Sequence, residues 1–232
     1  MSVLLVTSHP DDEVLGCGGL AASLSSQGVD VHSCILSSGA DARSARPAAP
    51  ELLRDLDTAH KMLGIRAYTL GQFPNIRMNT VPHLEVVQFI EEVILRTQAD
   101  VIYTHHPQDL NDDHRQTSLA CQAAARLAQR GQPVPSLKRL YYVEILSSTD
   151  WSFAGGGSGF QPDTFFELGE AHLATKIAAL GAYRNVMRPF PHPRSEEVVR
   201  GLATYRGGQA GMRYAEAFQT AFHALTVSEL ST

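Results

Sequence analysis

Hydrophobic residues in this chain occur in two patterns that alternate along the sequence. Short, uninterrupted runs such as Val3–Val6 are typical of buried strands, whereas longer stretches carry apolar residues every three or four positions, as amphipathic helices do. The first pattern predicts strands at residues 3–6, 29–36, 67–70, 100–104, 138–146 and 164–168. The second predicts helices from residue 14 onward and at 51–63, 81–95, 113–130, 169–183 and 195–225, the last one interrupted by glycines.

Strands that alternate with helices predict an α/β fold with Rossmann-like layering, in which helices flank a parallel sheet and the connections are right-handed. The length of 232 residues favours a single domain, 1–232. The strand at 164–168 is expected at a sheet edge. Residues 147–161 are polar and glycine-rich, which indicates either a lid over a site or an ordinary mobile loop. Tyr214 and Glu216 fall on the last predicted helix, where packing and an exposed face are the simplest interpretation.

Composition narrows the class of protein. Hydrophobic residues make up 44% and charged residues 19%, which is ordinary for a globular protein. A net charge of −5 offers no basic footprint for nucleic acid or an anionic membrane, so neither is expected as a partner. Cys17, Cys34 and Cys121 are scattered and fit a reducing compartment. No apolar run reaches the length of a membrane span, and no signal-peptide pattern precedes the first strand, so a cytoplasmic protein is expected.

The turn between the first strand and its helix, residues 8–13, carries one imidazole and adjacent carboxylates. In open α/β sheets such a turn lies at the carboxyl edge, where ligands bind. A divalent metal would compensate for packing these groups together, because His9 and Asp12 can converge on one ion while Asp11 faces the space beside it. The alternative is an acidic helix N-terminus, with Asp11 or Asp12 as the cap and Glu13 favourable to the helix dipole. This turn alone does not decide between the two.

A second cluster of the same kind favours the metal site. It spans residues 104–114, follows another strand-like run, and contains His105, His106 and the pair Asp113-His114. Two turns with metal-binding residue types, each after a strand, are rarely a coincidence. One of the two adjacent histidines, with His106 as our choice, is expected to orient a metal ligand from behind. The acidic residues earlier in this cluster are expected to cap the loop.

These residues resemble the zinc-dependent LmbE-like or PIG-L-type N-deacetylases. The resemblance rests on His-Pro-Asp-Asp-Glu at 9–13, followed by Val-Leu-Gly-Cys-Gly-Gly, and on the pair Asp113-His114. It extends over nearly the whole chain, and its later parts look like the branch of bacterial surface-polysaccharide and related amino-sugar deacetylases. Those later parts are residues 73–82, 189–195 and 214–218. The glycines follow the polar turn instead of preceding a helix start, so a nucleotide cofactor is not expected.

The resemblance implies a catalytic zinc ion held by His9, Asp12 and His114, with Asp11 as general base and Asp113 behind the site. Zinc lowers the pKa of a bound water from about 15.7 to about 7. That water would attack the N-acetyl carbonyl of an N-acetylglucosamine-type sugar in a glycoconjugate, nucleotide sugar or natural product, and acetate would leave. Iron would accept the same ligands. The alternatives are an amidase acting on a thiol-sugar conjugate or another N-acyl substrate, and a non-catalytic sugar-binding metal protein.

One position departs from the family pattern. Many members carry a histidine three places before the second zinc-binding histidine, where it stabilises the oxyanion, but this chain has Asn111 there. An amide can donate a hydrogen bond but cannot carry charge or shuttle a proton. We expect His192 to act in its place, or else His106 or His105. For His192 the alternative is a surface histidine in a proline-rich loop.

Two arginines are candidates for holding the substrate. A guanidinium presents several donors in fixed geometry, so Arg77 and Arg194 suit sugar hydroxyls or an attached phosphate, and surface arginines in local salt bridges are the alternative. Asn111 is expected to contact the substrate through its amide. The expected partner is therefore a small amino sugar or glycoconjugate, and the sequence leaves the oligomeric state open, a homo-oligomer included.

Overall fold

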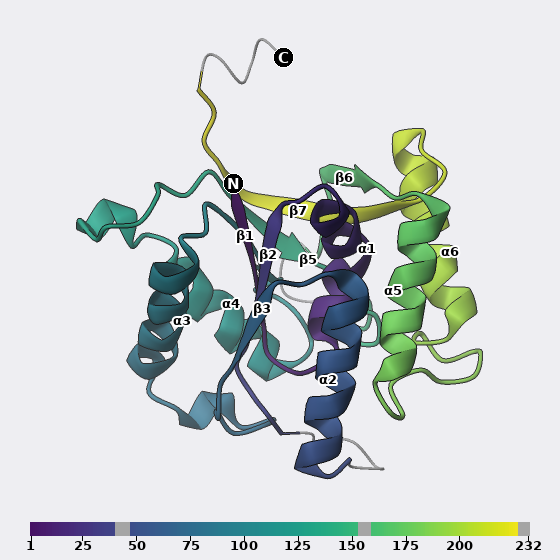
Figure 1. Ribbon diagram of the computed structural model, residues 1–232, viewed down its shortest axis with the longest axis horizontal. Coiled ribbons are helices and arrows are strands. Elements are labelled where there is room, and N and C mark those ends of the chain that lie inside the picture. Colours follow the sequence, from purple (N-terminus) through teal and green to yellow (C-terminus); the bar gives the residue numbers. More distant parts are fainter. Residues whose placement is uncertain (40–46, 153–158, 227–232) are drawn as a thin grey trace.

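The computed structural model describes residues 1–39, 47–152 and 159–226. Within these ranges one seven-stranded sheet is flanked by helices on both faces, so the expected α/β class is confirmed (Figure 1). The strand order is β3-β2-β1-β4-β5-β7-β6. The strands are β1 Ser2–Thr7, β2 Asp30–Ile35, β3 Ala67–Leu70, β4 Val101–His105, β5 Arg139–Val143, β6 Thr164–Glu167 and β7 Ala215–His223. The α-helices are α1 Asp12–Ser26, α2 Ala49–Leu63, α3 His83–Thr97, α4 Asp112–Ala124, α5 Glu170–Ala182 and α6 Glu196–Ala210.

The first five strands have the order of a Rossmann-like sheet. β1 pairs in parallel with β2 on one side and with β4 on the other. β2 pairs in parallel with β3, and β4 with β5. The order of the strands therefore reverses between β1 and β4, and ligands of such sheets bind in the crevice at this switch point, outside the carboxyl ends of the strands.

Strand β1 is buried on both faces, which explains its uninterrupted hydrophobic run. Val3 and Leu5 belong to the core cluster that includes residues of α1, α2 and α5. Leu4 and Val6 belong to the cluster that includes residues of α3 and α4. Figure 1 shows these two helix layers on opposite sides of the sheet. Alternate side chains of one strand thus hold both layers and fix where the turn after β1 emerges.

The prediction of one helix over residues 195–225 is wrong for its second half. Helix α6 ends before Gly211, whose φ of 73° lies in the left-handed region that glycine adopts without strain. Residues 215–223 then form β7, which pairs antiparallel with β5 on one side and with β6 on the other. The alanines of this run favour a helix, but two hydrogen-bonded ladders satisfy its backbone and override that preference. The sheet is therefore mixed at this end, and Glu216 is buried rather than exposed.

Other differences are smaller. The helix expected at 113–130 ends at Ala124, and a short 3₁₀ helix at Ala128–Arg130 takes the place of its last turns. Strand β6 lies at the sheet edge, as expected. Of the lid expected at 147–161, residues 153–158 lie outside the described residues.

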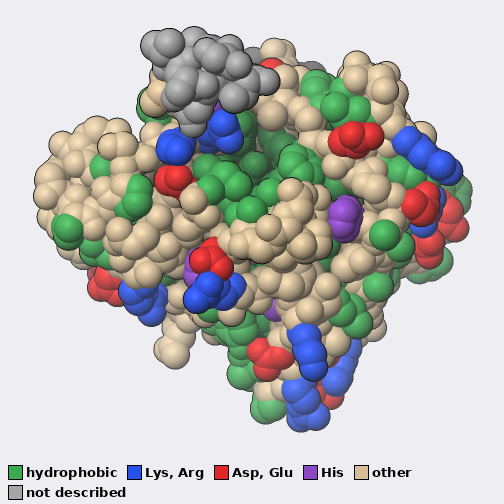
Figure 2. All heavy atoms as spheres, turned by 45° about the horizontal axis from the view of Figure 1, so that its top comes forward, with side chains coloured by type: hydrophobic (Ala, Val, Ile, Leu, Met, Phe, Trp, Pro, Cys, Tyr) green, Lys and Arg blue, Asp and Glu red, His purple; other side chains and the backbone are tan. Residues whose placement is uncertain are grey.

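Two surface properties bear on the expected partners. No helix in the described part of the chain has the length and the apolar character needed to cross a membrane. On the face shown in Figure 2, basic and acidic side chains are interspersed, without a broad field of one sign. The cytoplasmic location and the lack of a nucleic-acid partner stay predictions.

Candidate active site

The turn between β1 and α1 carries the first group of polar side chains. Asp11 is the N-cap residue of α1 and Asp12 is its first residue. Asp11 has a φ of 107°, a strained conformation for a residue other than glycine, and its side chain makes no capping hydrogen bond. The interpretation of this turn as an ordinary acidic cap therefore does not account for the Asp11 carboxylate.

The turn between β4 and α4 carries the second group. Asn111 is the N-cap residue of α4, and its Oδ1 accepts a hydrogen bond from the Asp113 backbone N–H at 3.0 Å. This cap starts the helix at Asp112 and places His114 in its first turn. Because β1 and β4 are parallel neighbours, the two turns leave the same edge of the sheet side by side.

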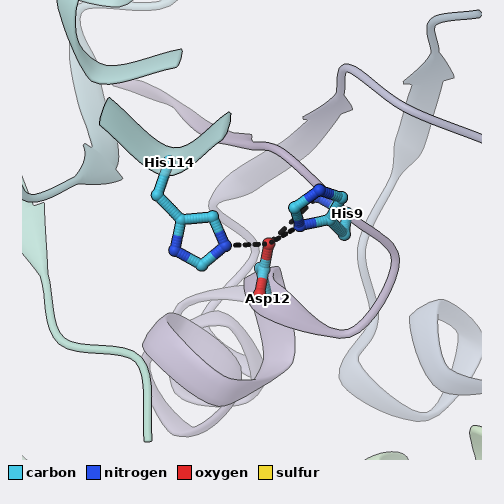
Figure 3. A group of neighbouring side chains, drawn as sticks. All are labelled: His9, Asp12 and His114. Carbon is cyan, nitrogen blue, oxygen red and sulfur yellow. Dashed lines mark hydrogen bonds and ion pairs between the residues drawn. The ribbon is translucent and has the colours of Figure 1, made fainter. Parts of the chain in front are cut away.

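His9, Asp12 and His114 converge at this edge (Figure 3). His9 Nδ1 and His114 Nε2 each lie 3.2 Å from Asp12 Oδ2. One ligand atom from each of the three residues lies within 4.8 Å of the other two. His114 Nε2 is buried, and among the described residues no group makes a hydrogen bond of good geometry with it. Two nitrogens and one carboxylate oxygen around a common point, one nitrogen otherwise unsatisfied, fit a divalent metal such as zinc.

Each of the two histidines turns its other ring nitrogen toward a second carboxylate. His9 Nε2 lies 2.9 Å from Asp113 Oδ2, and His114 Nδ1 lies 3.2 Å from Asp109 Oδ1. Such partners fix the tautomer and the ring orientation of a metal-binding histidine. Asp113 therefore lies where a residue behind the site was expected. Asp109 also accepts a hydrogen bond from the backbone N–H of Asn111, so it both caps the loop and holds His114.

The charges of the cluster favour a cation at its centre. Burial opposes charging of His114, but Asp12 and Asp109 outweigh it and raise the pKa of His114 to about 10. Burial also opposes charging of His9, whose pKa is nevertheless raised by Asp113 and Asp12. The pKa of Asp12 is well below its ordinary value, because the surrounding histidines outweigh its burial. The negative charge of the surrounding carboxylates can thus be neutralised in two alternative ways, by protons on these imidazoles or by a metal ion bound between them.

Asp11 is held from two sides. Its Oδ2 accepts a hydrogen bond from Arg194 Nη1 at 3.2 Å, and its backbone N–H donates to Glu13 Oε2 at 3.1 Å. Glu13 is fully buried, and its Oε1 accepts from the Tyr183 hydroxyl at 2.5 Å and lies 3.3 Å from His60 Nε2. Residues of α2 and the end of α5 thus support the strained backbone of Asp11 through one carboxylate.

A cavity of about 440 Å³ opens over this cluster, which is within the range of small-molecule sites. It is lined by acidic, amide, hydroxyl and large apolar side chains from every loop at this edge. The lining residues are His9, Asp11, Asp12, Gly39, Asn75, Ile76, Leu110, Asn111, Asp112, His114, Ser147, Ser148, Trp151 and Arg194. The predicted metal ligands, the predicted base and the substrate candidates Asn111 and Arg194 are therefore together in one cavity.

His105 and His106 lie on opposite sides of the chain, as adjacent residues at a strand end do. His105 stacks on His114 with ring centroids 3.8 Å apart, and burial together with that neighbour lowers its pKa to about 3. His106 packs edge-on against Tyr142 and Phe160 and does not line the cavity. The position behind the metal ligands that we expected His106 to take is occupied by His105.

Two further sequence candidates are outside the cavity lining. His192 Nδ1 accepts a hydrogen bond from the Arg194 backbone N–H at 3.0 Å, and its ring lies 6.2 Å from that of Trp151. Arg77 is exposed and does not line the cavity. Sequence reasoning singled out the segments 147–161 and 73–82 but did not name Trp151 or Ile76 as site residues, since a lone apolar residue in a loop carries no periodic signal.

Comparisons with known proteins agree with the resemblance. The sequence model of the PIG-L family, described as GlcNAc-PI de-N-acetylase, matches residues 4–125, more than half of the 232 residues. The Escherichia coli (strain K12) protein named uncharacterized deacetylase YaiS is 27% identical over 191 residues, which cover 79% of this chain and 90% of that protein.

Solved structures share the fold over the whole chain. The N,N'-diacetylchitobiose deacetylase of Pyrococcus horikoshii is 19% identical with a TM-score of 0.76, covering 99% of this chain and 88% of its own. The 4-carboxy-2-hydroxymuconate hydratase GalB of Pseudomonas putida KT2440 is 22% identical with a TM-score of 0.77, covering 97% and 98%. A deacetylase and a hydratase thus have this same fold, so the reaction has to be argued from the site.

Proposed function

This chain belongs to the PIG-L, or LmbE-like, family of de-N-acetylases, and we propose that it is a zinc-dependent hydrolase that removes the N-acetyl group from an N-acetylglucosamine-type amino sugar. The observation that carries the proposal is the position of Asp11. Its carboxylate lines the same cavity as His9, Asp12 and His114 and makes no capping hydrogen bond. A purely structural metal site has no use for a second carboxylate beside it at a strained residue.

The metal ligands in this proposal are His9 Nδ1, Asp12 Oδ2 and His114 Nε2, the three atoms that face one another. A mixed nitrogen and oxygen set with an open side is the usual arrangement of catalytic zinc. When bound there, zinc polarises a carbonyl group and lowers the pKa of water to about 7. Asp113 and Asp109 keep the two imidazoles turned toward the ion.

Asp11 moves the protons. In the first step its carboxylate takes a proton from the attacking water while a carbon–oxygen bond forms at the amide carbonyl. In the second step the carbon–nitrogen bond breaks, and the protonated Asp11 returns that proton to the departing amine. The second proton of the water stays on the new carboxyl group and then passes from it to the amine, so the products at neutral pH are acetate and the protonated amino sugar.

In this proposal Arg194 and Asn111 stabilise the oxygen that becomes negative. Arg194 lines the cavity and reaches Asp11, so it brings a positive charge beside the reacting atoms. Asn111 uses Oδ1 for the helix cap, which leaves its amide N–H groups to donate. His192 stabilises the loop that carries Arg194 through its contact with the Arg194 backbone N–H. His192 does not line the cavity, so in this proposal the oxyanion role expected of it passes to Arg194 and Asn111, and His192 acts as a positioning residue.

The test is release of acetate by zinc-loaded protein from free, nucleotide-linked, lipid-linked and glycosidic N-acetylglucosamine. We expect release from at least one of these sugars. Asp11→Asn, which keeps the size of the side chain but not its basicity, should reduce turnover at least about 100-fold and keep bound zinc. Asp112→Asn, at a partly exposed residue of the cavity rim, is the matched control and should keep its activity.

The same experiment separates the alternatives. Full activity of Asp11→Asn would remove the assigned base. Hydrolysis of a thiol-sugar amide or another N-acyl compound, but of no N-acetyl sugar in the panel, would move the chain to the related amidases. Because a hydratase shares the fold, a zinc-loaded protein that releases no acid from any amide would place the chain outside the deacetylases.

A further inference from the structure

Three large apolar side chains are exposed at the rim of the active-site cavity. Ile76 is 47%, Leu110 43% and Trp151 48% accessible to solvent, and all three line the cavity that contains the metal cluster. They come from the loops after β3, β4 and β5, so three separate loops each bring one such residue to the same opening. Single exposed apolar residues are common on protein surfaces, but several around one cavity indicate a binding surface.

Ile76 is held at this rim at an energetic cost. Its φ is 57°, a left-handed conformation that is a clear outlier for a β-branched residue. The Ile76 backbone N–H donates to Asp113 Oδ2 at 2.6 Å, and the Met78 N–H donates to Asp113 Oδ1 at 2.9 Å. The carboxylate that orients His9 therefore also fixes the loop that presents Ile76. Strain that surrounding contacts hold in place at a cavity is characteristic of a functional position.

The arginines at and beside the cavity already make hydrogen bonds or ion pairs within the protein. Arg194 binds Asp11 through Nη1 and the Ser147 hydroxyl through Nε at 2.9 Å. Arg115, beside the rim, pairs with Asp112 at 2.7 Å, and Arg77 does not line the cavity. Recognition of a phosphate ordinarily uses arginine or lysine side chains that are available to it. Among the described lining residues Arg194 is the only arginine or lysine, and two of its three nitrogens already bind Asp11 and Ser147, so we expect a phosphorylated or nucleotide-linked sugar to bind less well than an uncharged one.

The chemistry of an amino sugar decides which part of the substrate meets the rim. In a 2-acetamido sugar the N-acetyl group is on carbon 2, directly beside the anomeric carbon. When the acetyl carbonyl lies at the metal cluster, the anomeric oxygen is four bonds from the carbonyl carbon, so the group attached to that oxygen extends toward the cavity edge. The exposed large apolar residues available to contact it there are Ile76, Leu110 and Trp151.

We propose that Ile76, Leu110 and Trp151 form an apolar subsite for the group on the anomeric carbon, and that the substrate is an uncharged glycoside with an apolar or aromatic aglycone. This inference rests on the proposed deacetylase function and narrows its substrate class. The aglycone packs against the indole and the two aliphatic side chains, which gain apolar burial on binding.

The first experiment compares rates of acetate release. The substrates are the phenyl and methyl glycosides of N-acetylglucosamine, the sugar 1-phosphate and the uridine-diphosphate sugar. We expect kcat/KM for the phenyl glycoside to exceed that for the methyl glycoside roughly tenfold or more, with the two phosphorylated sugars below both. Trp151→Ala should bring the phenyl-to-methyl ratio close to one. Tyr205→Ala, at an aromatic residue of α6 that is 61% exposed and does not line the cavity, should leave the ratio unchanged.

A second experiment does not depend on turnover. Trp151 is the only tryptophan of the chain, so intrinsic tryptophan fluorescence reports on this subsite alone. With zinc-loaded Asp11→Asn protein, the phenyl glycoside should give a saturable change in emission at concentrations roughly tenfold lower than the methyl glycoside. Absence of a change with the phenyl glycoside overturns the subsite, even if acetate is released by the wild type. Equal rates for all glycosides, or fastest turnover of a phosphorylated sugar, overturn it as well and leave the deacetylase function intact. Saturable binding of the phenyl glycoside without any acetate release would support the subsite and reject the deacetylase function.

Discussion

Single residues in this protein are held in unusual positions by buried carboxylates. Glu13 has no exposed surface, yet its carboxylate contacts the backbone N–H of Asp11, the hydroxyl of Tyr183 and the ring of His60. A buried carboxylate needs such donors, and here they are available only when α2 and α5 are in place. The conformation of the proposed base therefore depends on residues of other helices that do not touch the cavity.

Tyr183→Phe tests this dependence. It removes one donor to Glu13 and keeps the ring, so we expect a loss of about 1–3 kcal/mol in the free energy of unfolding, measured with urea. We also expect kcat to fall with KM and zinc content unchanged, because the base is displaced and the cavity is not. Tyr68→Phe is the matched control, since the Tyr68 hydroxyl donates to the exposed Asp57. A loss of stability with normal kcat would mean that the network acts on the fold alone.

Asp113 has a similar position behind the metal cluster. It lies 2.9 Å from His9 Nε2 and accepts the backbone N–H groups of Ile76 and Met78. Asp113→Asn removes the charge that orients His9, and we expect zinc affinity to fall roughly 10- to 100-fold in a chelator competition. Asp112→Asn changes the neighbouring, partly exposed carboxylate and should leave the affinity unchanged. Equal affinities of the two variants would show that His9 needs no partner.

At the scale of elements, the strand that the sequence did not predict connects three parts of the fold. Glu216 on β7 accepts the backbone N–H groups of Gly19 and Leu20 in the middle of α1. It also pairs with Lys176 of α5 at 2.7 Å, and the ammonium group of Lys176 donates to the carbonyl of Leu15. The helix that begins at the metal turn is thus fixed halfway along its length by a strand and a second helix.

Removing one partner of this pair should be costly. Both side chains are less than one-tenth exposed, so Lys176→Met leaves the Glu216 charge buried without its cation. We expect the free energy of unfolding to fall by about 3–5 kcal/mol in chemical denaturation. Arg200→Met, which breaks the exposed pair of Arg200 with Glu170, should cost less than about 1 kcal/mol. Equal losses in the two variants would argue that the buried pair contributes no more than a surface one.

At the scale of the whole molecule, the site exists because the sheet brings two distant turns together. His9 and Asp113 are 104 residues apart in sequence, and their side chains lie 2.9 Å from each other. The two carboxylates that raise the pKa of His114 come from both turns: Asp12 lies after β1 and Asp109 lies after β4. Stability of the metal-free protein should therefore depend on pH.

The sign of this dependence follows from His114. Its pKa rises from 6.5 to about 10 in the folded protein, against the effect of burial. The stabilisation is complete below pH 6.5 and is lost as pH rises toward 10, so the melting temperature of the metal-free protein should fall across that window. His114→Gln should flatten the fall, whereas His83→Gln, at an exposed histidine, should not. Saturating zinc should also flatten it, because the bound imidazole has already lost its proton. An identical slope in His114→Gln and wild type would disprove this assignment.

Much of the fold was predictable because it is encoded locally. The hydrophobic run at β1 and the spacing in α2 identify their elements without any partner. The turn at residues 8–13 and the pair Asp113-His114 carry ligand types directly after strands, and strand ends of a parallel sheet share one edge. Strand β7 was not predictable in this way, because its alanines suit a helix and only pairing with β5 and β6 decides otherwise.

The sequence by itself determined the fold class, the edge of the sheet that carries the chemistry, and the residue types around the proposed metal site. Only the tertiary structure decided that His105 rather than His106 contacts the cluster, that Asp109 holds His114, and that Arg194 rather than His192 lines the cavity. The physical reason is the distance along the chain over which each kind of interaction acts. Periodicity and turn chemistry act within a few residues, whereas the atom that a side chain faces is set by packing among elements that the chain brings together from far apart.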